Sequence, residues 1–227
     1  MKLAVLFSGG KDSSFALWKA KEQHEIVCLV SMLSDNDESY MFQTANVHMT
    51  TILAEAIGIP LIQRKTRGQK EDELADMKDA LIEAKEKFGI EGVVTGALKS
   101  VYQASRVQRI CSELNLWCFN PLWLKDQVQH LRDIVSSGFK VMISGVFAFP
   151  LDEKYLGKII DEDLIKKFEE LHNRYLINPA GEGGEIETTT LDAPFFMKKV
   201  EIVDATMKWE ENSGTYIVKE AKLVEKQ

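Results

Sequence analysis

The chain opens with five apolar residues that lead directly into a glycine-rich turn, in the stretch LAVLFSGGKDSS at residues 3–14. Residues 3–7 have the pattern of a short buried strand, and residues 13–23 have the pattern of a helix. Gly9 and Gly10, between them, allow a tight turn. A strand that passes through such a turn into a helix is typical of the first unit of an α/β domain, and this constrains the fold class more than any other stretch.

The rest of the chain continues the alternation and then changes character. Strand patterns are expected at 26–33, 61–63 and 92–95, and helical patterns at 47–57, 70–88 and 103–114. Strands that alternate with helices predict a doubly wound, mostly parallel, Rossmann-like sheet. After residue 124 the patterns are helix (125–137), strand (139–147), helix (161–175) and a β-rich tail from 186 to 224. We therefore predict an α/β domain at residues 1–123 and a smaller α+β domain at 124–227.

Composition narrows the class of protein. The 227 residues have a net charge of −7, and 45% of them are hydrophobic, which is typical of globular chains. An acidic surface repels phosphate backbones, so stable binding of nucleic acid is not expected. No apolar stretch has the length of a membrane-spanning helix. The three cysteines show neither metal nor disulfide spacing, which favours a reducing compartment and predicts a cytoplasmic protein.

The opening turn has the chemistry of a phosphate site. Backbone N–H groups at the start of a helix attract anions, and the helix dipole adds to this attraction. The turn supplies the backbone of Gly9 and Gly10, the hydroxyls of Ser8, Ser13 and Ser14, and the ammonium group of Lys11. Asp12 has two interpretations: it caps the helix, or it holds a Mg²⁺ ion that bridges phosphates.

The stretch SGGKDS after the first strand resembles the PP-loop of N-type ATP pyrophosphatases, which cleave ATP between its α and β phosphates. The resemblance implies a fold of the adenine nucleotide alpha hydrolase type, ATP and Mg²⁺ as cofactors, and a loop that holds pyrophosphate. It implies catalytic roles for Lys11, Asp12 and Ser13. It also places Met32, in LVSML, against the adenine, and Gly96, in TGAL, close to the nucleotide.

Two later segments carry unusual chemistry. GALKSVYQASRVQRIC at 96–111 puts Tyr102 and Gln103 just after the fourth expected strand, where ligands gather in such sheets. An ordinary amphipathic helix explains the apolar positions of this segment but explains the Tyr-Gln pair less well. NPAGEGGEIETTTLDAPFF at 178–196 crowds Glu182, Glu185 and Glu187 together. Such acids repel one another and need a cation or donors nearby, unless they lie on a solvated turn.

SGGKDS, the GA…YQ…RV…C segment and GEGGEIET together resemble the diphthine–ammonia ligase family over essentially the whole chain. The resemblance implies that the carboxylate of diphthine on translation elongation factor 2 is adenylated and that ammonia then displaces AMP. It implies that the glutamates balance the trimethylammonium group of diphthine. The substrate-binding residues implied are Tyr102, Gln103, Arg106, Glu182, Gly183, Gly184, Glu185 and Glu187.

Several questions stay open at this point. Free ammonia is the expected donor, because the cysteine contexts VCLV, ICSE and WCFN lack a glutaminase pattern. One alternative is a tRNA sulfur transferase, which the basic run QRKTRGQK at 63–70 favours. Another is a non-catalytic ATP-binding module. The β-rich tail could form a homodimer or cover the first domain. The histidines are expected to be packing or surface residues: His24, His48, His130 and His172.

Overall fold

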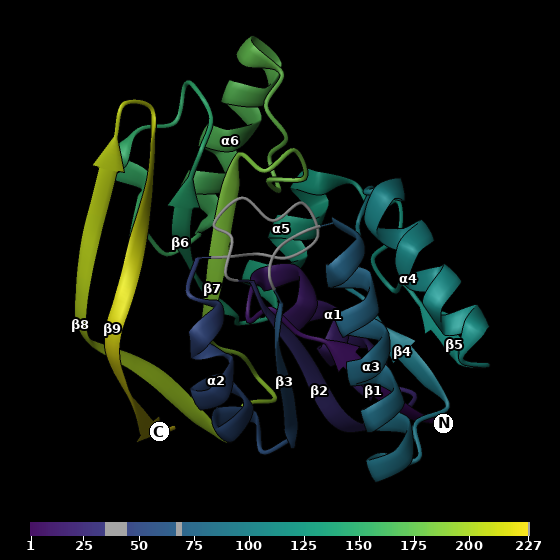
Figure 1. Ribbon diagram of the computed structural model, residues 1–227. Helices are drawn as coiled ribbons and strands as arrows, with labels where there is room; N and C mark the ends of the chain where they lie inside the picture. Colours follow the sequence, from purple (N-terminus) through teal and green to yellow (C-terminus); the bar gives the residue numbers. More distant parts are fainter. Residues whose placement is uncertain (35–44, 67–69, 227) are drawn as a thin grey trace.

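The computed structural model describes residues 1–34, 45–66 and 70–226. The first half forms a parallel five-stranded sheet with the order β3-β2-β1-β4-β5 (Figure 1). Its strands are β1 (Lys2–Leu6), β2 (Glu25–Ser34), β3 (Leu61–Thr66), β4 (Gly92–Val94) and β5 (Trp117–Phe119). Because β1 lies inside the sheet, the connections diverge on either side of it, and ligands bind at such a point in open α/β sheets.

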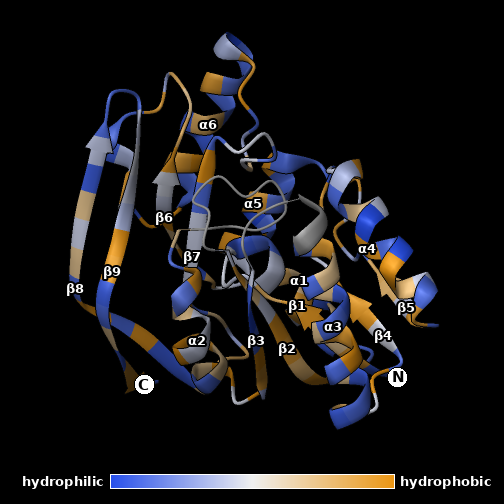
Figure 2. Ribbon diagram, in the orientation of Figure 1, coloured by the Kyte–Doolittle hydropathy of each residue, from blue (hydrophilic) through white to orange (hydrophobic). Residues whose placement is uncertain are grey.

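Helices cover both faces of this sheet. They are α1 (Lys11–Lys21), α2 (Thr50–Ile57) after the short 3₁₀ turn η1 (Val47–Met49), α3 (Lys70–Phe88) and α4 (Val101–Glu113). Successive residues of β1 point to opposite faces. Leu3 and Val5 pack with α1 and α2, whereas Ala4 packs with α3 and α4. Figure 2 shows β1 and β2 mainly in orange, as expected for strands that are covered by helices on both faces, whereas β3 is partly blue.

The second half is an antiparallel sheet with the order β7-β6-β9-β8. Its strands are β6 (Lys140–Val146), β7 (Ile186–Asp192), β8 (Lys198–Glu210) and β9 (Ser213–Glu225). Its helices are α5 (Gln127–Ser136), the 3₁₀ turn η2 (Glu153–Tyr155) and α6 (Glu162–Tyr175). The long β8–β9 hairpin, yellow in Figure 1, curves along one side of the molecule.

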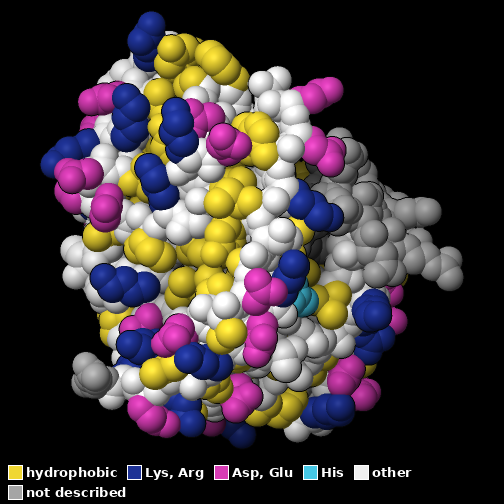
Figure 3. Space-filling model, turned by 90° about the vertical axis from the view of Figure 1, so that its left-hand side faces the viewer, with side chains coloured by type: hydrophobic (Ala, Val, Ile, Leu, Met, Phe, Trp, Pro, Cys, Tyr) yellow, Lys and Arg dark blue, Asp and Glu magenta, His cyan; other side chains and the backbone are white. Residues whose placement is uncertain are grey.

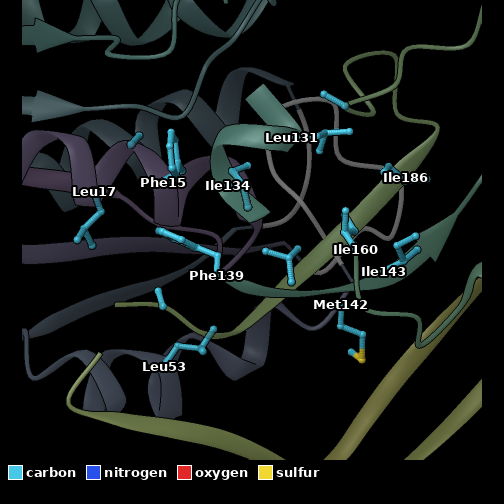
Figure 4. Packing of buried hydrophobic residues seen from close by; sticks show 14 of the residues in the cluster. Phe15, Leu17, Leu53, Leu131, Ile134, Phe139, Met142, Ile143, Ile160 and Ile186 are labelled. Carbon is cyan, nitrogen blue, oxygen red and sulfur yellow. The ribbon is translucent and has the colours of Figure 1, made fainter. Parts of the chain in front are cut away.

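One hydrophobic core joins the two halves. Phe15 of α1 packs on Phe139, which directly precedes β6, with ring centroids 5.4 Å apart. Figure 4 shows Leu17, Phe15, Leu131, Ile134 and Phe139 converging on the same interior. The second half is therefore fixed against α1, the helix that follows the glycine-rich turn.

The predicted doubly wound fold with an α+β second part is confirmed, and α3 begins and ends where the sequence predicts. The boundary after residue 123 stays a prediction. Strand β5 was not predicted: it is as short as β4, but in LNLWCFNPLW apolar residues lie on both sides of it and no glycine marks its bounds. Most of the expected loop SDNDES lies outside the described residues, as do residues 67–69 of the basic run. None of the helices in the described part of the chain has both the length and the apolar content needed to cross a bilayer.

Candidate functional site

A cavity of about 520 Å³ lies at the carboxyl ends of β1, β2 and β4. Segments from both halves line it: the glycine-rich turn, β2, residues 95–103 and residues 181–188. Twelve of the predicted site residues lie in its wall: Ser8, Lys11, Asp12, Ser13, Met32, Gly96, Tyr102, Gln103, Glu182, Gly183, Gly184 and Glu187. The volume is in the range of cavities that hold small ligands. The individual roles of these twelve residues stay predictions.

The glycine-rich turn is shaped by Gly9, whose φ of +79° lies in the left-handed region. A Cβ atom on Gly9 would lie 2.7 Å from Leu53 Cδ1, so both the conformation and the space require glycine. The Ser8 and Ser13 hydroxyls are 3.2 Å apart, and Ser13 Oγ donates to the Gly10 carbonyl. Gly9, Gly10 and the buried Ser14 thus shape the turn from behind, while Ser8 and Ser13 face the cavity.

Asp12 is held by two donors. Lys11 Nζ donates to Asp12 Oδ2 at 2.8 Å and also to the Ala180 carbonyl. His130 Nε2 lies 2.7 Å from Asp12 Oδ1 and donates to it. Burial raises the pKa of Asp12, but the Lys11 charge and the His130 hydrogen bond outweigh this effect and lower it from 3.8 to about 2. Asp12 is therefore a fixed carboxylate at neutral pH.

His130 is a site residue that the sequence analysis missed. It lies on α5, is fully buried, and packs edge-on against Phe15 with centroids 5.5 Å apart. Its Nδ1 has no partner among the described residues, so Nε2 is the nitrogen through which the ring acts. Nothing in the α5 sequence marks this histidine, because its partner precedes it by 118 residues.

The second half also closes directly on the turn. The Thr188 hydroxyl accepts from the Lys11 N–H at 3.1 Å, and the Thr190 N–H donates to the Gly9 carbonyl at 2.8 Å. Gly96 approaches the same turn from the other side. A Cβ atom on Gly96 would lie 2.7 Å from Ser13 N, so glycine lets the two backbones touch. The turn is thus clamped between β7 and the segment after β4.

Hydrogen-bond donors, most of them backbone N–H groups, offset the repulsion among the three glutamates. Glu182 accepts from Lys99 N at 2.9 Å, and Glu187 accepts from Ala45 N at 2.7 Å. Glu185 accepts from Asn178 N, Asn178 Nδ2 and Gly183 N, and it does not lie in the cavity wall. Burial, and next the Asp12 charge, raise the pKa of Glu182. Glu185 therefore organises the loop, whereas Glu182 and Glu187 face the cavity.

The start of α4 adds an aromatic wall. Ser100 caps the helix by accepting from Gln103 N, and Tyr102 and Gln103 line the cavity. Arg106 lies with its guanidinium carbon 3.5 Å from the centroid of the Tyr102 ring. Arg106 thus supports Tyr102 from behind and is not itself in the cavity wall.

Comparison with known proteins gives a consistent result. The family model "Diphthamide synthase N-terminal domain" matches residues 1–117, and "Diphthamide synthase C-terminal domain" matches residues 126–224. The chain is 38% identical to the diphthine–ammonia ligase of Homo sapiens, an alignment that covers 91% of this chain and 84% of the relative.

Two further comparisons show lower sequence identity. The chain is 34% identical to the diphthine–ammonia ligase of Schizosaccharomyces pombe, with coverage of 90% of this chain and 36% of that longer relative. A solved structure described as a predicted subunit of a tRNA methyltransferase from Methanocaldococcus jannaschii has a TM-score of 0.41 and 17% identity, covering 86% of this chain and 98% of that one.

Both family models fall on the two halves that build the cavity, one supplying the glycine-rich turn and the other the acidic loop. Together with the relatives, they show that this chain belongs to the diphthamide synthase family.

Proposed function

We propose that this protein uses ATP and ammonia to convert the carboxylate of diphthine, on elongation factor 2, into the amide of diphthamide. One observation carries the proposal. A single cavity is lined by a phosphate-binding turn from the first half and by an acidic, glycine-rich loop from the second. An enzyme that joins a nucleotide to a cationic side chain needs these two surfaces to face each other.

The first step transfers AMP. The diphthine carboxylate attacks the α-phosphorus of ATP, an acyl-adenylate forms, and pyrophosphate leaves. The N-terminus of α1 and the Ser8 and Ser13 hydroxyls suit the leaving pyrophosphate, because they offer donors and a positive dipole end. Lys11, 3% exposed, supplies a full positive charge beside them. In the second step ammonia attacks the acyl carbon, AMP leaves, and a proton is released.

Asp12 is the residue we propose to hold Mg²⁺. In the described part of the chain no three His, Cys, Asp or Glu side chains form a metal cluster. Mg²⁺ at nucleotide sites commonly uses one or two carboxylates together with the phosphates, so a single ionised carboxylate beside the turn fits this ion. When bound, Mg²⁺ would offset phosphate charge. Lys11 and His130 keep the Asp12 carboxylate ionised and oriented for that purpose.

Glu182 and Glu187 are the proposed partners of the quaternary ammonium group. Both lie in the cavity wall, and each is oriented by a backbone N–H. The Tyr102 ring, which lies in the wall of the same cavity, can add a cation–π contact. A cation buried beside Glu182 would also favour the ionised form of this glutamate, which the Asp12 charge disfavours.

Free ammonia is the proposed nitrogen donor, and the cysteines support neither a glutaminase nor sulfur transfer. None of the three lies in the cavity wall. A hydrogen bond with Cys118, together with burial, raises the pKa of Cys111, and burial raises the pKa of Cys28 to about 12. Cys28 and Cys111 are therefore poor nucleophiles, and Cys118, whose pKa the hydrogen bond with Cys111 lowers, lies outside the cavity wall. We place the reaction in the cytoplasm, where the elongation factor works, and a homodimer stays a prediction for sedimentation to test.

The test supplies purified protein with ATP, Mg²⁺, ¹⁵N-ammonium and diphthine-bearing elongation factor 2, and follows the modified residue by mass spectrometry. We expect ¹⁵N in the product together with AMP and pyrophosphate. ADP in place of AMP would exclude adenylation. Labelling from amide-¹⁵N glutamine alone would exclude free ammonia as the donor.

A further inference from the structure

We propose that exposed apolar residues around the mouth of the cavity form the docking surface for the folded protein that carries the reacting side chain. This inference rests on the proposed function, because it concerns the macromolecular substrate of the same site. The surface, called the apolar rim below, consists of Val101, Leu124, Phe147, Phe149, Tyr175 and Leu176.

One part of the rim is continuous with the first half of the cavity wall. Val101 stands between Ser100 and Tyr102, both of which line the cavity. Leu124 N donates to the Leu98 carbonyl at 2.8 Å, which fixes Leu124 beside the segment that contains Gly96. These two apolar side chains therefore flank the nucleotide-facing wall.

The other part is continuous with the acidic loop. Phe147 N donates to the Glu185 carbonyl at 2.9 Å. The Phe147 ring and Glu187 Cβ both lie against the Cβ position of Gly145, at 2.5 and 3.2 Å. Phe149 packs edge-on against Tyr175 with centroids 5.4 Å apart. Leu176 follows Tyr175 directly and precedes the acidic loop. This part of the rim is therefore hydrogen-bonded to the acidic loop at Phe147 and joined to it along the chain at Leu176.

The rim is unusual in exposure and in backbone. Leu176 is 80% exposed, Phe149 72%, and Val101 and Leu124 68% each. Leu124 and Leu176 also have φ values of 61° and 60°, a left-handed conformation that non-glycine residues adopt rarely and often at functional sites. Figure 3 shows hydrophobic side chains gathered at the top of the molecule, at the height where Figure 1 places the end of α6.

A protein substrate explains this arrangement better than other occupants do. The cavity has the carboxylates of Asp12, Glu182 and Glu187 in its wall and suits a positively charged side chain. A free small molecule would be enclosed by the cavity and would not reach apolar residues outside it. A second copy of this chain seated on the rim would close the mouth against any protein substrate. Protein interfaces are enriched in aromatic residues relative to the rest of the surface, and Phe147, Phe149 and Tyr175 supply exposed aromatic rings here.

The test compares two double variants, Phe149→Ser/Leu176→Asn and Val101→Ser/Leu124→Asn. Asparagine tolerates the left-handed backbone, so these changes remove apolar area without forcing a new conformation. Trp117→Ser is the matched control, because Trp117 is also 68% exposed but lies on β5, hydrogen-bonded to Glu91 at the opposite end of the parallel sheet. Direct binding of diphthine-bearing elongation factor 2, ATP binding, and amidation of the factor and of a short diphthine peptide are measured.

We expect each rim variant to weaken binding of the factor at least about tenfold, because each removes two large apolar contacts from the interface. Binding of ATP and turnover of the peptide should stay within about twofold of wild type. The inference is overturned if both substrates are affected equally, if the factor binds as tightly as to wild type, or if the variants convert a wild-type dimer into monomers. Binding is measured directly, so the two proposals can fail separately. If the wild-type protein binds the factor through the rim but does not amidate it, the proposed function is refuted and the inference about the rim is not.

Discussion

His130→Leu removes one hydrogen-bond donor from the centre of the site and leaves most of the packing volume in place. In the native protein, Nε2 of this buried ring donates to Asp12 Oδ1 at 2.7 Å, and Lys11 Nζ occupies the other carboxylate oxygen. After the substitution Oδ1 loses that donor, and the leucine side chain cannot replace it. We therefore expect the carboxylate to be both less firmly oriented and less strongly acidic.

The structure sets the size of this effect. A hydrogen bond to a charged group is worth about 1.5–3 kcal/mol, which corresponds to roughly a 10- to 100-fold loss in any step that needs Asp12 ionised and oriented. The fall in the Asp12 pKa from 3.8 to about 2 is worth about 2 kcal/mol of folding free energy, shared with Lys11. Because the folded pKa is the lower one, this stabilisation is present above pH 4 and is lost as the pH falls towards 2.

The assay measures Mg-ATP binding by calorimetry, AMP release in a single turnover, and unfolding by denaturant at pH 7 and pH 2.5. His130→Gln, which keeps an N–H near the position of Nε2, should recover most of the loss. His24→Leu is the control, since His24 packs on Phe119 with centroids 5.2 Å apart and lines no part of the cavity. Wild-type ATP binding and AMP release in His130→Leu, or equal damage from leucine and glutamine, would refute the reasoning.

Three further predictions concern the walls of the cavity. Gly96→Ala should lower ATP affinity at least about tenfold, because its Cβ would lie 2.7 Å from Ser13 N; unchanged calorimetry would contradict this. Glu185→Gln should leave ATP affinity within about twofold but impair amidation, because the amide nitrogen that replaces one carboxylate oxygen cannot accept a hydrogen bond from Asn178 or Gly183. Equal loss of ATP binding and of amidation would place the loop in the nucleotide site. Glu182→Gln should raise the unfolding free energy at pH 7 without ligand, because the raised pKa makes ionisation costly, and the gain should vanish on acidification through pH 4.5.

The sequence by itself determined the local elements and the class of the fold. The apolar run before Gly9 and the helical spacing of residues 70–88 depend on residues a few positions apart, and the structure shows β1, its turn and α3 where these patterns predict them. The glycine-rich turn and the acidic loop could also be recognised, because each is a contiguous motif. Strand β5 could not, because it is short and apolar residues lie on both sides of it without a glycine to mark its bounds.

Only the tertiary structure decided which side chains meet. His130 reaches Asp12 because α5 packs against α1 through Phe15, a contact between residues more than a hundred positions apart that no local pattern encodes. The same holds for the division of labour among the glutamates. Glu185 and Glu187 are two positions apart in the sequence, yet one turns into its own loop and the other faces the cavity. The backbone donors that orient them, Gly183 and Asn178 for one and Ala45 for the other, are set by the fold and not by the motif.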